Sequence, residues 1–288
     1  MKNYYLLTAA LVAMCGLAAQ RSSAASEKEF AKVINVAGRQ RMLSQKMAAE
    51  FLLMKLGIAA EDNKKKMDAD ISTFDKSLAS LSNGDGEAGI PAPPNEQISR
   101  QFAQVKLLWG SYVRALQSAG TSSVADIATL GDPILRESDK AVTMYEFAAE
   151  EAGIKKTGAV VNIAGRQRML SQKMTKETCL IALGENKSEA LSNLKSTRQL
   201  FETSHNALLK GSKELGIPAT TQPEIKKQMA EVDGFWKQFN VLISEIITSG
   251  DSNAFKTAKI AELSQNLLTA MDKAVTLYAE SGKPAAKS

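Results

Sequence analysis

Two arginines, Arg41 and Arg168, occupy the same place in two nearly identical runs of sequence, and a pair of guanidinium groups is suited to binding anions. The runs read N-V-A-G-R-Q-R-M-L-S-Q-K-M over residues 35–47 and N-I-A-G-R-Q-R-M-L-S-Q-K-M over residues 162–174, so 12 of 13 positions are identical. A guanidinium remains protonated in proteins, and its paired N–H donors match planar anions that carry several oxygens. If the two side chains meet, they repel each other unless something anionic lies between them. The sequence therefore predicts a site for a small oxyanion.

The two runs are parts of a longer internal duplication. They are separated by 162 − 35 = 127 residues, and the same separation relates Trp109 to Trp236. The pentapeptide D-K-A-V-T occurs at residues 139–143 and again at 272–276, a separation of 133, which places a small insertion in the last connection of the second copy. Similarity over most of both copies predicts two repeated structural units.

Each run is expected to lie on a helix with two buried faces. Apolar residues around the first run recur every three or four positions without a proline or a turn cluster, which predicts a helix over residues 28–58. The face opposite the ordinary core face carries a stripe of mostly small or apolar residues around one arginine. In the first copy the stripe is Ile34, Gly38, Arg41, Gln45, Ala48 and Leu52, and in the second it is Val161, Gly165, Arg168, Gln172, Thr175 and Cys179. A glycine inside a helix costs about 0.5–1 kcal/mol relative to alanine. Gly38 and Gly165 therefore indicate the close approach of another backbone, and we expect the two stripes to pack against each other.

The residues around the arginines divide by their expected role. Gly38 and Gly165 are expected to line the anion site. Residues that could position the arginines, rather than hold the anion, are Asn35, Asn162, Arg39, Arg166, Gln45 and Gln172. Gln40 and Gln167 fall on the core face, where we expect buried hydrogen bonds.

The repeated run resembles the P-box of the periplasmic sensor domains of nitrate and nitrite sensor kinases and of PilJ-type chemoreceptors. In that family the P-box opens the first helix of an antiparallel four-helix bundle, two bundles dimerise through it, and one nitrate is held across the dimer. The family's anion-binding arginine directly precedes the methionine, which falls here on Arg41 and Arg168, and its glycine falls on Gly38 and Gly165. The resemblance implies nitrate or nitrite as the ligand, with nitrate favoured, and no cofactor. Family members usually carry transmembrane helices and kinase or methyl-accepting modules, whereas this chain carries two sensor units and resembles a covalently linked pseudo-dimer.

The predicted fold class is all-α, with two tandem antiparallel four-helix bundles, residues 26–153 and 154–282, forming an intrachain pseudo-dimer. Glycine and proline clusters separate eight predicted helices, at about residues 28–58, 61–82, 96–118, 124–152, 156–184, 187–214, 221–249 and 252–281. The segment between Gly153 and Gly158 predicts a tight reversal that sets the bundles side by side. If the chain instead runs straight on, the bundles stack end to end and each arginine needs a partner from a second chain.

The two ends of the chain carry their own predictions. Residues 1–25 contain one lysine, an apolar run and a small-residue exit, which together predict a secretory signal peptide. Cleavage after Ala25 predicts a periplasmic protein without a transmembrane span, and we do not expect lipid attachment at Cys15. Export leaves Cys179 as the only cysteine, so no intrachain disulfide is expected. Residues 283–288 are expected to be disordered.

Three other classes of function are alternatives to an anion sensor. A ligand-free interaction or scaffold protein would use the stripe only to join the bundles, but such a seam would be expected to be apolar. The net charge of +5 and pI near 9.0 could indicate a nucleic-acid or membrane surface. The basic residues are nevertheless interspersed with acidic ones, and the signal peptide argues against nucleic acid. An enzyme finds little support, because the chain has a single histidine, His205, and no Glu-x-x-His pattern. No catalytic or metal-binding residue is predicted, and His205 is expected to lie on or beside a helix surface.

The output of a sensor without its own signalling module would pass to a separate protein. The sequence suggests a membrane sensor, a reductase or a transport system as the kind of partner and does not identify it.

Overall fold

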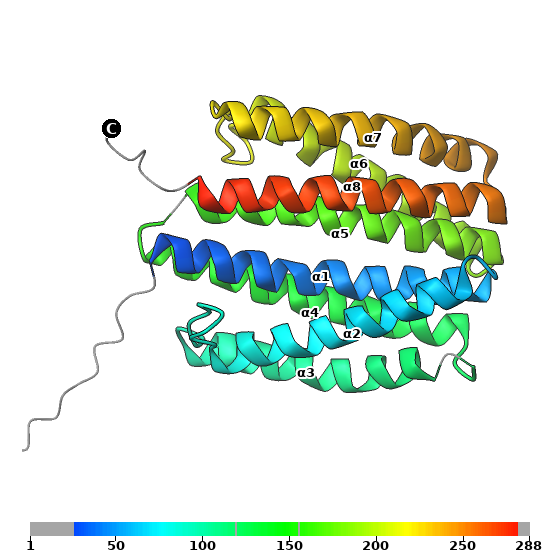
Figure 1. Cartoon of the computed structure of the whole chain (residues 1–288), viewed down its shortest axis with the longest axis horizontal. Helices are drawn as coiled ribbons and strands as arrows, with labels where there is room; N and C mark the ends of the chain where they lie inside the picture. The colour runs from blue at the N-terminus through cyan, green and yellow to red at the C-terminus, as the bar shows by residue number, and fades with distance from the viewer. Residues whose placement is uncertain (1–25, 119, 155, 282–288) are drawn as a thin grey trace, which may run out of the picture.

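The computed structural model describes residues 26–118, 120–154 and 156–281, and within them the protein is all-helical (Figure 1). The helices are α1 (Glu27–Lys55), α2 (Ala60–Asn83), α3 (Glu96–Gln117), α4 (Val124–Glu151), α5 (Lys156–Leu183), α6 (Lys187–Lys210), α7 (Pro223–Ser249) and α8 (Ala254–Glu280). The predicted fold class is confirmed, since α1–α4 form one group of four and α5–α8 form another. The predicted signal peptide, Cys15 and the tail lie outside the described residues.

The two bundles stand side by side, joined through α1 and α5. These two helices run in the same direction at the centre of the molecule, while α2 and α3 form one outer side and α6 and α7 the other (Figure 1). The chain reverses after α4 at Gly153, whose φ is +85°. The backbone N–H of Ile154 donates to the carbonyl of Ala149 at 2.8 Å, the 6→1 bond of a Schellman motif. The side-by-side prediction is therefore confirmed, and the end-to-end arrangement is excluded.

The same turn ends the motif helices of both repeats. Gly57 after α1 and Gly184 after α5 have φ values of +72° and +73°, and each is followed by a 6→1 backbone hydrogen bond. This explains why α1 ends at Lys55 and does not extend to residue 58 as predicted: Gly57 satisfies the last carbonyls of the helix with backbone donors.

The stripes that face the other bundle are buried, as the sequence predicted. Every stripe residue named above in α1 and α5 is buried, and the two stripes meet where α1 packs along α5. Gln40 and Gln167 on the core faces donate to the carbonyls of Phe74 and Phe201 at 3.2 and 3.3 Å. Their expected role as buried hydrogen-bonding residues is confirmed.

The two tryptophans also repeat their environment. Trp109 stacks on Phe74 with ring centroids 4.0 Å apart, and Trp236 stacks on Phe201 at 4.1 Å. Both tryptophans are buried, so their predicted place in the cores is confirmed.

Two further predictions were wrong. The helix expected over residues 187–214 ends at Lys210, because Gly211, with φ +80°, begins a loop in which Ser212 and Ile217 exchange backbone hydrogen bonds. The first repeat has the same loop, in which Asp85 bonds Ile90. His205 is not on the surface but is 2% exposed beside the ring of Phe201. Its position matches Leu78 of the first repeat (205 − 127 = 78), so it lies on a core face.

Candidate anion-binding site

Arg41 and Arg168 meet at the contact between α1 and α5. Each has a relative exposure of 0%. A methyl carbon added to Gly38 would lie 3.2 Å from Nη2 of Arg41 and 3.8 Å from Nη2 of Arg168. At Gly165 the corresponding distances are 3.3 Å to Arg168 and 3.6 Å to Arg41. Both guanidinium groups thus converge on the small space that the two glycines leave between the helices.

Each arginine is paired with an aspartate that the sequence reasoning did not identify. Nη1 of Arg41 donates to Oδ1 of Asp139 on α4 at 2.5 Å, and Nη1 of Arg168 donates to Oδ1 of Asp272 on α8 at 2.6 Å. These aspartates are the first residues of the repeated D-K-A-V-T pentapeptides. The negative charge expected near the arginines is therefore supplied in part by the protein. The repeated pentapeptide is the feature of the sequence that could have identified these aspartates, but the sequence prediction used it only as evidence of the duplication.

The opposite edge of each guanidinium is only partly used. Nη2 of Arg168 donates to the side-chain Oδ1 of Asn35 at 2.8 Å, and Nη2 of Arg41 lies 3.5 Å from the backbone carbonyl of Asn162. Nε of each arginine is buried and has no hydrogen-bond partner among the described residues. A buried donor without a partner costs free energy. The Nε–H and Nη2 edge is a two-pronged donor of the kind that binds oxyanions.

The two halves of this centre differ at the asparagines. Asn162 does not approach an arginine through its side chain as Asn35 does. Its Nδ2 donates to Oε2 of Glu146 at 2.5 Å, while its own Oδ1 is buried and unpartnered among the described residues. Burial raises the pKa of Glu146 to about 7, with the Asn162 hydrogen bond and the nearby arginines opposing that rise. The matching position in the second repeat is Ala279 (146 + 133 = 279), so the centre is a pseudo-symmetric pair with one additional carboxyl.

The charge balance around the buried pair leans positive. Burial lowers the pKa of Arg41 and Arg168, and the aspartates oppose that shift. Arg166 lies with Nη2 3.8 Å from Oδ1 of Asp139, with its side chain 39% exposed, and Arg39 lies close enough to act electrostatically on Arg168. Two arginines face two aspartates at the centre, and two further arginines flank them.

The remaining predicted positioning residues bond away from the guanidiniums. Gln172 donates through Nε2 to Oγ of Ser264 at 2.9 Å, and Gln45 donates to Oγ of Ser44 at 3.3 Å. Both glutamines are buried in the α1–α5 stripe one turn beyond the arginines. Gln172 thereby links α5 to α8, whereas Gln45 bonds within α1, and the influence of either residue on the arginines would pass through packing.

Two helical bundles joined through parallel motif helices, with a shared buried charge centre, define a duplicated four-helix-bundle module. Residues 23–130 and 152–263 match the family of N-terminal domains of type IV pili methyl-accepting chemotaxis transducers, PilJ, and the chain belongs to this family. The two matched segments correspond to the two repeats.

A curated relative extends the comparison. Methyl-accepting chemotaxis protein McpN from Pseudomonas aeruginosa is 39% identical over 126 residues, which make up 43% of this chain and 23% of the relative. This chain therefore aligns with less than a quarter of that receptor's length. No solved structure matches the chain significantly. None of the helices that the structure describes has the length and apolar composition needed to cross a membrane.

Proposed function

We propose that this protein is a periplasmic sensor module for nitrate, nitrite or a similar small oxyanion, held between Arg41 and Arg168. The observation that carries the proposal is the convergence of two fully buried guanidiniums on Gly38 and Gly165, with neither Nε atom partnered within the described part of the chain. An oxyanion would accept from the Nε–H and Nη2 edges of both arginines and would relieve their mutual repulsion. No residue of the centre is assigned a catalytic role.

Signalling would arise from movement of the helices that form the site. The Nη2 atoms already lie 3.2–3.8 Å from where a glycine side chain would begin, which is contact distance. An ion with several oxygens therefore has to shift α1 relative to α5, and each of these helices is part of a different bundle. The shift can bias a partner protein only to the extent that the anion binds the two arrangements with different affinity.

Calorimetric titration of the mature protein with nitrate tests the proposal, with nitrite, chlorate and sulfate in parallel. We expect one anion per chain and loss of binding in both Arg41→Ala and Arg168→Ala. Arg100→Ala, which removes an exposed arginine paired with Glu96 on α3, is the matched control and should bind normally. If no anion gives heat, and none raises the melting temperature at high concentration, the sensor proposal is wrong.

A ligand-free scaffold is the second candidate, and the aspartate pairs favour it. Asp139 and Asp272 already pair with Arg41 and Arg168, so the charges of these four residues cancel without any ligand. The double variant Arg41→Leu, Arg168→Leu separates the two functions. For a scaffold it should preserve or increase stability and leave partner binding unchanged. For a sensor it should preserve the fold and abolish anion binding.

A further inference from the structure

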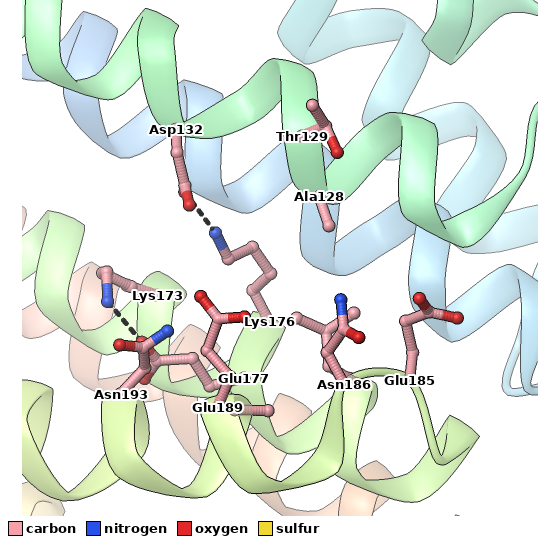
Figure 2. Close-up of a pocket in the computed structure, with 12 residues that line it drawn as sticks. Ala128, Thr129, Asp132, Lys173, Lys176, Glu177, Glu185, Asn186, Glu189 and Asn193 are labelled. Carbon is pink, nitrogen blue, oxygen red and sulfur yellow. Dashed lines mark hydrogen bonds and ion pairs between the residues drawn. The ribbon is translucent and has the colours of Figure 1, made fainter.

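The duplication also creates two related clefts at the far end of the motif helices, away from the arginine centre. The first, which we call the closed cleft, has a volume of about 160 Å³ and lies between α4, α5 and α6 (Figure 2). The second, the open cleft, has a volume of about 390 Å³ and lies between α1, α2, α5 and α8. Residues of the two linings correspond through the same separations of 127 and 133 that relate the repeats, so differences between the clefts can be read position by position.

A lysine bridges the closed cleft. Lys176 on α5 extends to Asp132 on α4, with Nζ 2.8 Å from Oδ1 and its side chain only 5% exposed (Figure 2). Beside it, Lys173 bonds Glu177 and also donates to Oγ1 of Thr197 at 2.9 Å. Burial raises the pKa of Glu177, and both lysines oppose that rise. This cluster therefore contains two ammonium groups and two carboxylates.

The open cleft lacks one of these cations. Ala49 stands where Lys176 stands in the closed cleft (176 − 127 = 49), which removes the long side chain. Asp70 replaces Thr197 (197 − 127 = 70), and Lys46 pairs with both Asp70 and Glu50, the latter at 3.1 Å. Two carboxylates thus share one ammonium group.

Glu50 is left incompletely satisfied by this exchange. Its side chain is 5% exposed, and Oε2 has no hydrogen-bond partner among the described residues, while Oε1 has only the ion pair with Lys46. Burial, reinforced by the charge of Asp70, raises the pKa of Glu50, and Lys46 opposes the rise. A buried carboxylate without donors is costly unless it takes up a proton or a cation or a donor reaches it.

The other groups that face the open cleft do not supply this cation. Lys66 is exposed on α2, and Glu262 on α8 is exposed and paired with Lys259 at 2.9 Å. Gln265 stands where Asp132 stands in the closed cleft (132 + 133 = 265), so the α8 wall is neutral there. The rest of the lining is uncharged: apolar side chains that include Leu53, Ala258 and Ala261, and the polar side chains of Asn63, Gln172, Thr175 and Asn266.

We propose that the open cleft is a binding site for a small primary ammonium ion, which takes the place that the Lys176 side chain fills in the closed cleft. The ammonium group would donate to Glu50, and a short hydrocarbon tail would lie along Ala49 and the apolar lining. The closed cleft shows how a side chain can fill this space, since a lysine is an alanine extended by a propylammonium group, but the ammonium group of Lys176 bonds Asp132 there and not Glu177, the counterpart of Glu50. Because the neutral Gln265 replaces Asp132 in the open cleft, the ammonium group of the ligand would turn to Glu50. This site is separate from the arginine centre and does not depend on nitrate binding.

Titration of the mature protein with n-propylammonium, followed by calorimetry and by amide chemical shifts, tests this proposal. We expect saturable binding to the wild-type protein, with shifts at Ala49 and Glu50 and with propionate giving none. Ala49→Lys supplies the missing cation covalently and should raise the melting temperature while weakening propylammonium binding about 10- to 100-fold, the effect of losing a charged hydrogen bond. Ala230→Lys, at an exposed alanine of α7, is the matched control and should do neither.

Two further variants keep the proposal open to refutation if Ala49→Lys fails to fold. Glu50→Gln should lose propylammonium binding, and Lys176→Ala should open the closed cleft and add a second site. The absence of propylammonium binding to the wild type, unchanged binding in Glu50→Gln, or binding of propionate in the same cleft would each overturn it. Nitrate titration of the same variants should be unaffected, so a failure here is distinguishable from a failure of the anion proposal.

Discussion

Arg41 on α1 donates to Asp139 on α4 of the same bundle, while its other terminal nitrogen faces the opposite bundle. Arg168 and Asp272 repeat this relationship in the second bundle. The arginine is thus held by its own bundle and presented to the other one. An anion at the centre would compete with the aspartates for the guanidiniums. The aspartate pairs that stabilise the protein without ligand therefore also lower its affinity for an anion.

The first prediction concerns this competition. Asp139→Asn should destabilise the protein by about 1.5–3 kcal/mol, since it removes the negative charge that pairs with Arg41 and leaves this buried arginine without its counterion. The same change should tighten nitrate binding, because the centre gains one net positive charge. Urea unfolding with and without nitrate measures both effects, and Asp68→Asn, in an exposed pair with Lys64, serves as the control. Weaker nitrate binding in Asp139→Asn would contradict the competition.

The second prediction concerns the space between the helices. Gly38→Ala places a methyl carbon 3.2 Å from Nη2 of Arg41, and Gly165→Ala places one 3.3 Å from Nη2 of Arg168. The gain of about 0.5–1 kcal/mol from replacing a helical glycine should be largely cancelled by this crowding, so unfolding should change by less than about 1 kcal/mol. Nitrate binding should be lost, because the methyl group occupies the space at the arginines.

Gly234→Ala is the matched control for these glycine variants. Gly234 lies within α7, and an added methyl carbon would meet nothing within 4 Å. This variant should gain the full helical stabilisation and bind nitrate normally. Retained nitrate binding in Gly38→Ala and Gly165→Ala would show that the anion does not use the space between the two glycines.

The sequence predicted the arginine pair better than it predicted the surroundings of that pair. A stripe of small and apolar residues opposite a core face, occurring twice, indicates that two helices pack there, and this was enough to bring Arg41 and Arg168 together. Asp139 could not be placed in the same way, because which residue of α4 faces α1 depends on how the helices rotate within the bundle. Gly211 matches Gly84, which ends α2 in the first repeat (211 − 127 = 84), so the end of α6 could have been predicted from the duplication. The predicted helix extended past Gly211 because the helical periodicity continues beyond it. His205 was misplaced because a polar residue at a core position breaks the pattern that would reveal it.

The third prediction concerns Glu146, whose pKa burial raises to about 7. The ordinary glutamate pKa is about 4.3, so between these pH values the folded protein binds more protons than the unfolded chain. Stability due to the protonated carboxyl is fully present below about pH 4.3 and is lost as pH rises to about 7, by at most about 1.4 kcal/mol per pH unit. Glu146→Gln should remove this dependence on pH. The free energy of unfolding of Glu146→Gln relative to wild type should therefore increase from about pH 4.3 to about pH 7 and then stay constant.

Unfolding by urea at a series of pH values measures the difference between wild type and Glu146→Gln. Glu150→Gln, at an exposed position on the same helix, controls for loss of a surface charge. A difference that is constant with pH would show that Glu146 is not perturbed. Because Glu146 holds the side chain of Asn162, the nitrate affinity of Glu146→Gln should also change, and Asn162→Ala should reproduce that change if it acts through the asparagine.

The fourth prediction has the opposite dependence on pH. Burial lowers the pKa of His205, and the hydrogen bond to Asp233 opposes the shift. The unfolded chain therefore takes up a proton near pH 6.5 that the folded protein resists, and stability is lost as pH falls from about 6.5 toward the lower folded pKa. His205→Leu, which installs the residue found at Leu78 in the first repeat, should remove this loss and also eliminate a buried Nδ1 that has no partner among the described residues. Asp233 keeps its pairing with Lys237 at 2.7 Å, so the substitution does not isolate a charge.

The stability advantage of His205→Leu over wild type in urea unfolding should therefore increase from pH 7 to pH 5, whereas Asn206→Leu, exposed on the same turn, should show no such trend. An advantage that shrinks toward pH 5 would mean that His205 is stabilised in its protonated form by Asp233 and that burial does not dominate.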